Sequence, residues 1–324
     1  MSSLAPWLDS AWQRLARSLV TGRLAHALLL TGDSRPDLAA LGERLLAALL
    51  CEQPAAGAVA CGTCRSCHLH AQGHHPDLLR VEPQEDAPDR IKVDAIRALT
   101  GFVSLSSHYG RRRVVLLQPA DAMTPSAANA LLKTLEEPPA AALLVLLTRR
   151  PSALLPTVRS RCQRQVLTAP SREQAVDWLT GQGIDQPAAA LALAGDAAEA
   201  LAWAGDGELA ARRELAAGLA ELAEGRADPV AVAERWEKDL SRVAEVLSRL
   251  AALLARAGAG DCDARRSLPD ERWRKLSARV DWQRMLAFTG QAFQARRARE
   301  RSLNARLALE ELLIDWCRAA GDGS

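Results

Sequence analysis

The sequence lacks the features that would place the chain in a membrane or outside the cell. No apolar run approaches the roughly 20 residues that a bilayer-spanning helix needs. The segment from Met1 to Ser10 carries neither the basic stretch nor the long apolar core of a secretory signal. Charge of either sign is not in excess, because 41 Lys and Arg oppose 39 Asp and Glu. We therefore expect a cytoplasmic protein, and bulk charge indicates no particular partner.

The length and composition are those of an ordinary globular chain. With 324 residues the chain can form two or three domains and bury a substantial core. Apolar residues make up 48% and charged residues 25%, both usual for globular proteins.

The stretch 114–162 has the layout of half a nucleotide-hydrolase core. Val114–Leu117 is an apolar run that suits a buried parallel strand. Thr124 can cap a helix in which Pro125 occupies the first turn. A second buried strand is expected at 143–148. The helix between them has an apolar face formed by residues at helical spacing: Ala128, Leu131, Leu132 and Leu135.

An apolar strand at 26–32 ends in Gly32, and a helix is expected from about Asp37 to Leu50. A phosphate-binding loop would stand between them. When its glycine–lysine motif is aligned from Gly32, Asp37 stands at the second glycine, Leu38 at the lysine and Ala39 at the magnesium-binding hydroxyl. An aspartate with no lysine beside it repels phosphates. We predict that this loop keeps the architecture and binds no ATP.

Four cysteines, Cys51, Cys61, Cys64 and Cys67, have the spacing of a metal site. Four thiolates can close a tetrahedral zinc site and leave no position open for catalysis, so structural zinc is predicted in a module at 51–76. The alternative is a set of free thiols in a loop. Four flanking histidines are expected to be surface residues, although one could replace a cysteine: His68, His70, His74 and His75.

Two basic stretches could contact nucleic acid. Gly110–Arg113 contains three arginines, and such a run at the end of a strand is usually solvated. Within 265–318 there are 13 Lys and Arg against seven Asp and Glu. The tryptophans among them, Trp273, Trp282 and Trp316, are expected in the core of a helical bundle rather than at a nucleic-acid surface.

Two motifs resemble those of the bacterial replicative clamp-loader subunits, which belong to the AAA+ family. One is the segment Asn129–Pro139, and the other is Ser160-Arg161-Cys162, a tripeptide that follows the second strand of the core. The resemblance implies an α/β core of P-loop type with a parallel sheet over 1–168, followed by a small helical lid domain at 169–207. It further implies an all-α collar domain at 208–324, which joins the subunits.

The resemblance also implies which chemistry is missing. The acidic pair that holds magnesium in working subunits is Gln118-Pro119 here, and the lid motif that ends in arginine ends in Ala198. Glu136-Glu137 is expected to be a solvated pair rather than a substitute. In the family, the Ser-Arg-Cys motif supplies an arginine finger to ATP on a neighbouring subunit, which assigns this role to Arg161.

The implied assembly is a pentameric ring with the ATP-binding gamma/tau subunits and the delta subunit. That ring loads the beta sliding clamp onto primer–template DNA. An active AAA+ ATPase is one alternative, and the losses at Leu38, Gln118-Pro119 and Ala198 argue against it together. A zinc-containing nucleic-acid-binding adaptor is another, and it should bind DNA with a steep dependence on salt.

Overall fold

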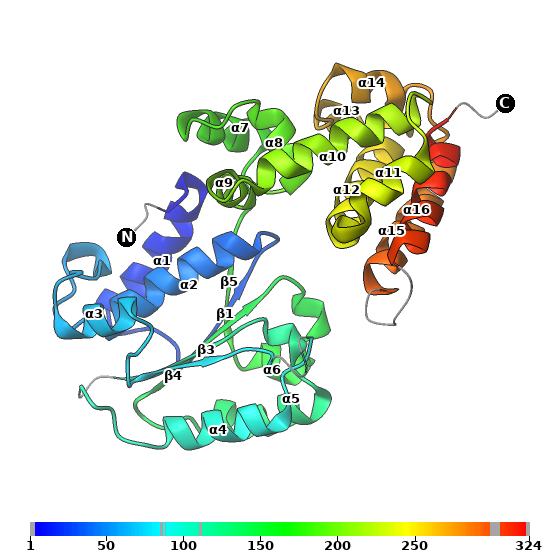
Figure 1. Ribbon diagram of the computed structural model, residues 1–324. Coiled ribbons are helices and arrows are strands. Elements are labelled where there is room, and N and C mark those ends of the chain that lie inside the picture. The colour runs from blue at the N-terminus through cyan, green and yellow to red at the C-terminus, as the bar shows by residue number, and fades with distance from the viewer. Residues whose placement is uncertain (1–3, 85–86, 88, 110–111, 299–304, 322–324) are drawn as a thin grey trace. The chain divides into compact units, whose positions relative to one another are not determined.

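The computed structural model describes residues 4–84, 87, 89–109, 112–298 and 305–321. The chain divides into two compact units, Met1–Ala169 and Pro170–Ser324, and Figure 1 labels most of their helices and strands. Across the described ranges, each helix is too short or too polar to serve as a membrane span.

The first unit is built on a sheet of five parallel strands in the order β2-β3-β4-β1-β5. The strands are β1 (Ala27–Thr31), β2 (Leu78–Val81), β3 (Arg113–Leu117), β4 (Ala142–Thr148) and β5 (Gln163–Val166). Every residue of β1, β3 and β4 is buried. The predicted parallel sheet is confirmed, because apolar runs without alternation require cover on both faces.

Helices cover both faces of this sheet (Figure 1). The helix α2 packs on one face, where an added Cβ at Gly42 would lie 3.3 Å from the side chain of Leu147. The helices α4 and α5 share a core with alternate residues of β3 and β4, among them Val115 and Leu144. The helical segments are η1 (Pro6–Leu8), α1 (Asp9–Val20), α2 (Arg35–Leu50), η2 (Ala56–Ala58), α3 (Arg65–Ala71), α4 (Val93–Val103), η3 (Ala120–Ala122), α5 (Pro125–Glu136), η4 (Pro151–Ala153) and α6 (Pro156–Ser160).

Side-chain caps set the starts of α2 and α5. The Thr124 hydroxyl accepts the backbone N–H of Ala127 at 3.2 Å, as predicted for the start of α5. Ser34 accepts the N–H of Asp37 at 3.1 Å, so α2 begins at Arg35, two residues before the predicted start.

Arg113 is buried, which corrects the prediction of a solvated arginine run. Its Nε and Nη2 donate to the carbonyl oxygen of Ser106 at 3.1 and 2.7 Å, and its guanidinium lies over the Phe102 ring. Nε also lies 3.8 Å from the carboxylate of Asp77, whose side chain is 1% exposed. Strand register explains the pairing, because Leu78 is the partner of Val114, so the two preceding residues are neighbours. Gly110 and Arg111 of the run lie outside the described residues.

The second unit is helical throughout its described part. Its segments are α7 (Arg172–Gly181), α8 (Pro187–Ala194), α9 (Ala197–Gly205), α10 (Glu208–Ala223), α11 (Pro229–Trp236), η5 (Glu237–Asp239), α12 (Leu240–Gly258), α13 (Cys262–Arg266), α14 (Glu271–Ser277), α15 (Trp282–Ala298) and α16 (Ala305–Ala320). Trp273 and Trp316 are core residues as predicted, whereas Trp282 is 41% exposed, which corrects its assignment to the core. The division of this unit into a lid and a collar stays a prediction.

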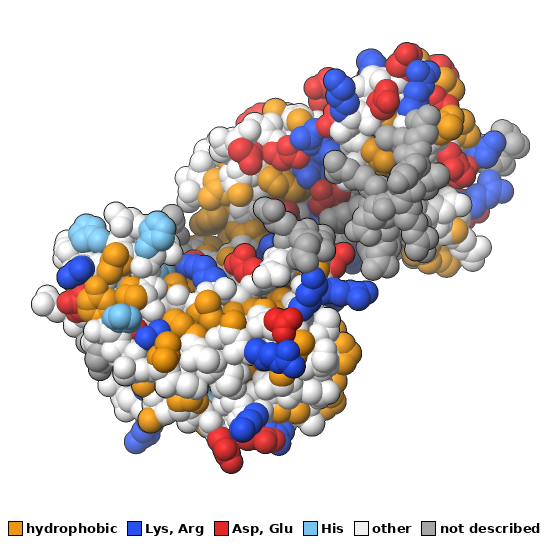
Figure 2. Space-filling view, turned by 60° about the horizontal axis from the view of Figure 1, so that its bottom comes forward, with side chains coloured by type: hydrophobic (Ala, Val, Ile, Leu, Met, Phe, Trp, Pro, Cys, Tyr) orange, Lys and Arg blue, Asp and Glu red, His pale blue; other side chains and the backbone are white. Residues whose placement is uncertain are grey.

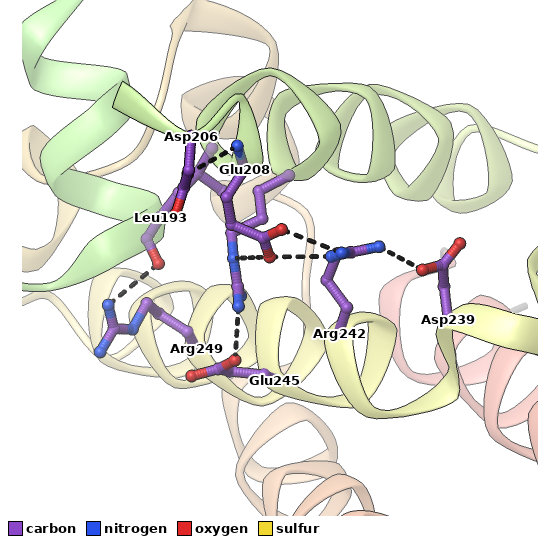
Figure 3. A network of polar contacts seen from close by, with 8 residues as sticks. Leu193, Asp206, Glu208, Asp239, Arg242, Glu245 and Arg249 are labelled. Atoms are coloured by element: carbon purple, nitrogen blue, oxygen red, sulfur yellow. Dashed lines mark hydrogen bonds and ion pairs between the residues drawn. The ribbon is translucent and has the colours of Figure 1, made fainter. Parts of the chain in front are cut away.

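Ion pairs tie the helices of the second unit together (Figure 3). Arg212 on α10 donates to Glu208 at 2.9 Å and to Glu245 on α12 at 2.8 Å. Arg242 on α12 makes a two-pronged contact with the same Glu208, at 2.8 and 2.9 Å. Farther along α12, Arg249 donates to the carbonyl oxygen of Leu193 on α8. The network therefore links α8 and α10 through α12, across the boundary predicted between lid and collar.

Candidate functional site

The loop after β1 carries its own negative charge where a phosphate would bind. Asp37 lies in the first turn of α2, is 6% exposed, and accepts the indole N–H of Trp7 at 2.7 Å. A carboxylate at this place complements the positive end of the helix dipole, which a phosphate would otherwise do. Leu38, at the position of the catalytic lysine, is buried and 3% exposed. The loop therefore offers a nucleotide neither an uncompensated helix end nor a cation at position 38.

Gly32 has a packing reason to be glycine. A Cβ built on Gly32 would lie 3.0 Å from the Cβ of Leu167, which follows β5. This contact is tighter than ordinary van der Waals packing. The glycine after β1 is thus explained by the close approach of two chain segments.

Gln118-Pro119 follows β3, at the position where the family resemblance predicts the magnesium-binding acidic pair. Gln118 donates its side-chain amide to Glu82 at 2.7 Å. Asp121, three residues farther on, has a side chain that is 5% exposed and accepts bonds from Thr148 at 2.6 Å and Arg150 at 2.7 Å. Its carboxylate thus links the segments that follow β3 and β4.

The segment Gly195 to Ala198, at the position predicted for the lid motif, spans the junction of α8 and α9. Gly195 caps α8 with φ +79°, and a Cβ there would lie 2.4 Å from Cζ of Arg249. The Arg249 guanidinium binds the C-terminal end of α8, where the helix dipole favours a cation. Sequence reasoning missed this arginine, because it lies 54 residues after Gly195 and has no local motif.

Arg161 stands at the C-terminal end of α6 and keeps a partly exposed guanidinium. Its Nη1 donates to the carbonyl oxygen of Thr157 at 3.0 Å, and its Nη2 lies 2.5 Å from Oε1 of Glu136. The side chains of Arg161 and Glu136 are 34% and 49% exposed. Glu136 and Glu137 are both exposed, as predicted, and Glu136 is in addition the ion-pair partner of Arg161.

The residues on either side of Arg161 serve local structure. The Ser160 hydroxyl donates to the carbonyl oxygen of Thr157 at 3.1 Å. Cys162 is buried in the core of the first unit, and this burial raises the pKa of its thiol to about 11. Of the tripeptide, Arg161 carries the charge that another molecule could meet.

The four predicted cysteines come together around one point. Their sulfur atoms all lie within 4.8 Å of one another, with Sγ–Sγ distances of 4.0 Å for Cys51–Cys64 and 3.9 Å for Cys61–Cys67. A tetrahedral zinc site with Zn–S bonds of about 2.3 Å has edges of about 3.8 Å. The arrangement fits a metal ion of that size, so this group could hold one.

Backbone amides already point at the sulfur atoms. The N–H groups of Cys61, Cys64 and Cys67 donate to Sγ of Cys51, Cys61 and Cys64, respectively, at 3.3 to 3.4 Å. Hydrogen bonds from Thr63 lower the pKa of Cys61 to about 6, whereas burial raises the pKa of Cys67 to about 12. A bound cation would favour the thiolate form at every position.

The histidines beside the cluster divide into two kinds. His68 and His74 are exposed, as predicted. His75 is buried: it bonds with the Ser66 hydroxyl and accepts the N–H of Asp77 at 3.1 Å, which corrects its assignment to the surface. His70 is also largely covered, with a side chain that is 12% exposed. Among the described residues, the group that could hold a metal ion consists of the four cysteines alone.

Basic side chains do not gather into one patch on the face shown in Figure 2. Among the described residues on that face, Lys and Arg are interspersed with Asp and Glu.

Comparison with known proteins identifies relatives of this chain. A family model described as DNA polymerase III, delta subunit, matches residues 7–171, and one described as the C-terminal part of that subunit matches residues 206–318. The DNA polymerase III subunit delta' of Pseudomonas aeruginosa is 44% identical over 223 residues, which are 68% of this chain and 64% of that protein. The subunit delta' of Escherichia coli is 42% identical over 175 residues, 54% of this chain and 52% of that protein.

A further relative carries a different subunit name. DNA polymerase III subunit tau of Escherichia coli is 36% identical over 160 residues, 49% of this chain and 24% of that protein. The chain thus matches less than two thirds of the length of each of these relatives. Since the first family match alone spans about half of the chain and the second lies in the helical unit, the chain belongs to the DNA polymerase III delta-subunit family, with relatives named delta'.

Proposed function

We propose that this chain is a clamp-loader subunit of AAA+ type that binds no ATP and supplies Arg161 to ATP on a neighbouring subunit. The observation that carries the proposal is a contrast between two places in the first unit. At the loop after β1, Asp37 is buried and bonded to Trp7. At the end of α6, the Arg161 guanidinium is partly exposed. A chain that binds no nucleotide cannot use Arg161 for ATP hydrolysis of its own. A neighbouring subunit that binds ATP can use it to stabilise the transition state.

The chemistry of phosphoryl transfer explains why an arginine is needed. Negative charge on the γ-phosphate oxygens must be stabilised in the transition state, and a planar guanidinium does this from outside the nucleotide-binding chain. Ser160 and Cys162 support the end of α6 by a hydrogen bond and by core packing.

The cofactor in this proposal is one structural zinc ion held by Cys51, Cys61, Cys64 and Cys67. Zinc would link the C-terminal end of α2 to α3, since Cys51 caps α2 and Cys64 caps α3. Four protein ligands leave no site for substrate, so the ion would stabilise the module at 51–76.

The proposed partners are those of the replicative clamp loader. They are the gamma/tau and delta subunits in a cytoplasmic hetero-pentamer, with the beta sliding clamp and primer–template DNA reached through the complex. In this arrangement 169–207 is the lid and 208–324 is the collar through which the subunits assemble. The names of the relatives, delta' and tau of DNA polymerase III, support this choice.

The test is reconstitution of the chain with gamma/tau and delta subunits, comparing the unaltered protein with Arg161→Ala. The variant should enter the complex normally, because the change removes a partly exposed charge and no core packing. Its clamp- and DNA-stimulated ATPase should fall, although by less than the about 10³–10⁵ of a single finger, since the ring has several ATP sites. Arg161→Lys should restore activity only in part, because an ammonium lacks the planar fork.

Arg159→Ala is the matched control, because Arg159 is an exposed arginine on the same short helix. It should leave the ATPase unchanged. An Arg161→Ala complex that loads clamps at the unaltered rate would show that the trans role is wrong.

A further inference from the structure

We infer that Glu136 is a positioning residue for Arg161. The carboxylate, at the end of α5, holds the guanidinium at the end of α6 in the orientation that a neighbouring subunit's phosphate would meet. This inference rests on the proposed function of Arg161 and adds a residue to which neither a motif nor a comparison assigns a role.

Two acceptors contact the Arg161 guanidinium from different directions. Oε1 of Glu136 lies 2.5 Å from Nη2, and the carbonyl oxygen of Thr157 accepts from Nη1 at 3.0 Å. The two acceptors come from different helices, α5 and α6, so they restrict both the position and the tilt of the guanidinium plane. A long side chain without such contacts loses rotamer entropy when it is ordered at an interface.

The place of Glu136 on its helix argues for a specific partner. Glu136 is the last residue of α5, where the negative end of the helix dipole disfavours a carboxylate. Glu137, the next residue, is exposed, whereas the Glu136 carboxylate meets a cation. The Arg161 pairing offsets the dipole penalty at position 136.

The ion pair leaves donors available for a ligand. A guanidinium has five N–H groups, and the two contacts use one on Nη1 and one on Nη2. The remaining N–H groups can reach phosphate oxygens while Glu136 stays bound. An ion pair this exposed is also weak, so it orients Arg161 without withholding it from a phosphate.

The experiment compares Glu136→Gln with Glu137→Gln in the reconstituted complex, each with and without Arg161→Ala. Glutamine keeps the size of the side chain and removes its charge. Glu136→Gln should lower kcat of the stimulated ATPase about two- to five-fold, the change that corresponds to an exposed ion pair. KM for ATP should not change, because the finger acts in the transition state. Glu137→Gln should change neither.

The background with Arg161→Ala separates positioning from a purely structural role. There, Glu136→Gln should have no further effect, since a positioning residue acts only through the group that it orients. A loss of the same size in both backgrounds would overturn the inference in favour of a general structural effect. An unchanged or raised kcat in Glu136→Gln would also overturn it, the raised value indicating that Glu136 restrains Arg161.

The same measurements distinguish failure of the inference from failure of the proposed function. Loss of ATPase activity in Arg161→Ala without any loss in Glu136→Gln would contradict the positioning role of Glu136 and leave the finger role intact. If Arg161→Ala itself has full ATPase activity, both the finger role of Arg161 and the positioning role of Glu136 are wrong.

Discussion

The indole N–H of Trp7 lies 2.7 Å from a carboxylate oxygen of Asp37, 30 residues away along the chain. This hydrogen bond connects η1, which contains Trp7, to the first turn of α2. It gives the buried Asp37 a donor in the first turn of α2, where a carboxylate complements the positive end of the helix dipole. Trp7 thus gives the loop after β1 a contact that stabilises it with Asp37 buried.

Restoring the missing lysine should not restore ATP binding. In Leu38→Lys, the Asp37 carboxylate still faces the phosphates, and Gln118-Pro119 still provides no magnesium carboxylates. Calorimetry should detect no saturable ATP binding at micromolar concentrations, either in the variant or in the unaltered chain. Because Leu38 is buried, Leu38→Met is the control for folding. Robust magnesium-dependent ATP hydrolysis by the pure chain would instead favour the ATPase alternative.

Protein purified without chelators should contain one zinc per chain by elemental analysis. Cys64→Ser should lower both the zinc content and the thermal stability of the first unit, because metal binding and folding of the module are coupled. Cys262→Ser is the matched control, since Cys262 is exposed and belongs to the second unit. Equal zinc content in the two variants would refute the four-cysteine site.

Arg113→Met should destabilise the first unit strongly. The change leaves Asp77 buried without its cation, and breaking a buried pair in this way costs about 3–5 kcal/mol. Asp77 keeps the N–H donors of His108 and Tyr109, which favours the lower end of that range. Urea unfolding, with hydrogen exchange at β2 and β3 as the local probe, measures the loss. Arg112→Met should stay within about 0.5 kcal/mol, and a similar loss in both variants would contradict the role of the pair.

Gly195→Ala should destabilise the second unit more than Gly225→Ala. Both glycines have positive φ, +79° and +69°, so both changes cost about 1–2 kcal/mol in backbone strain. Only at Gly195 would the new methyl meet Arg249 at 2.4 Å, whereas no atom lies within 4 Å at Gly225. Thermal unfolding compares the two variants. Gly195→Ala and Arg249→Ala should be less than additive, and full additivity would exclude the clash as the cause.

Patterns close together along the chain determined much of the fold. The runs at Val114–Leu117 and 143–148 predicted buried strands, because a strand without alternation must be covered on both faces. The spacing of Cys51, Cys61, Cys64 and Cys67 predicted the cluster, because short loops can bring residues that are close along the chain to one point. The substitutions at Asp37 and Leu38 indicated a loop without nucleotide chemistry.

Tertiary structure alone decided which side chains pair across long stretches of sequence. Strand register places Asp77 beside Arg113, and helix packing brings Glu136 to Arg161 and Arg249 to Gly195. No local pattern marks such partners, since each pair depends on where two separately formed elements meet. The sequence therefore determined the elements, because their patterns are local, whereas packing decided which charges are buried and which guanidinium stays partly exposed.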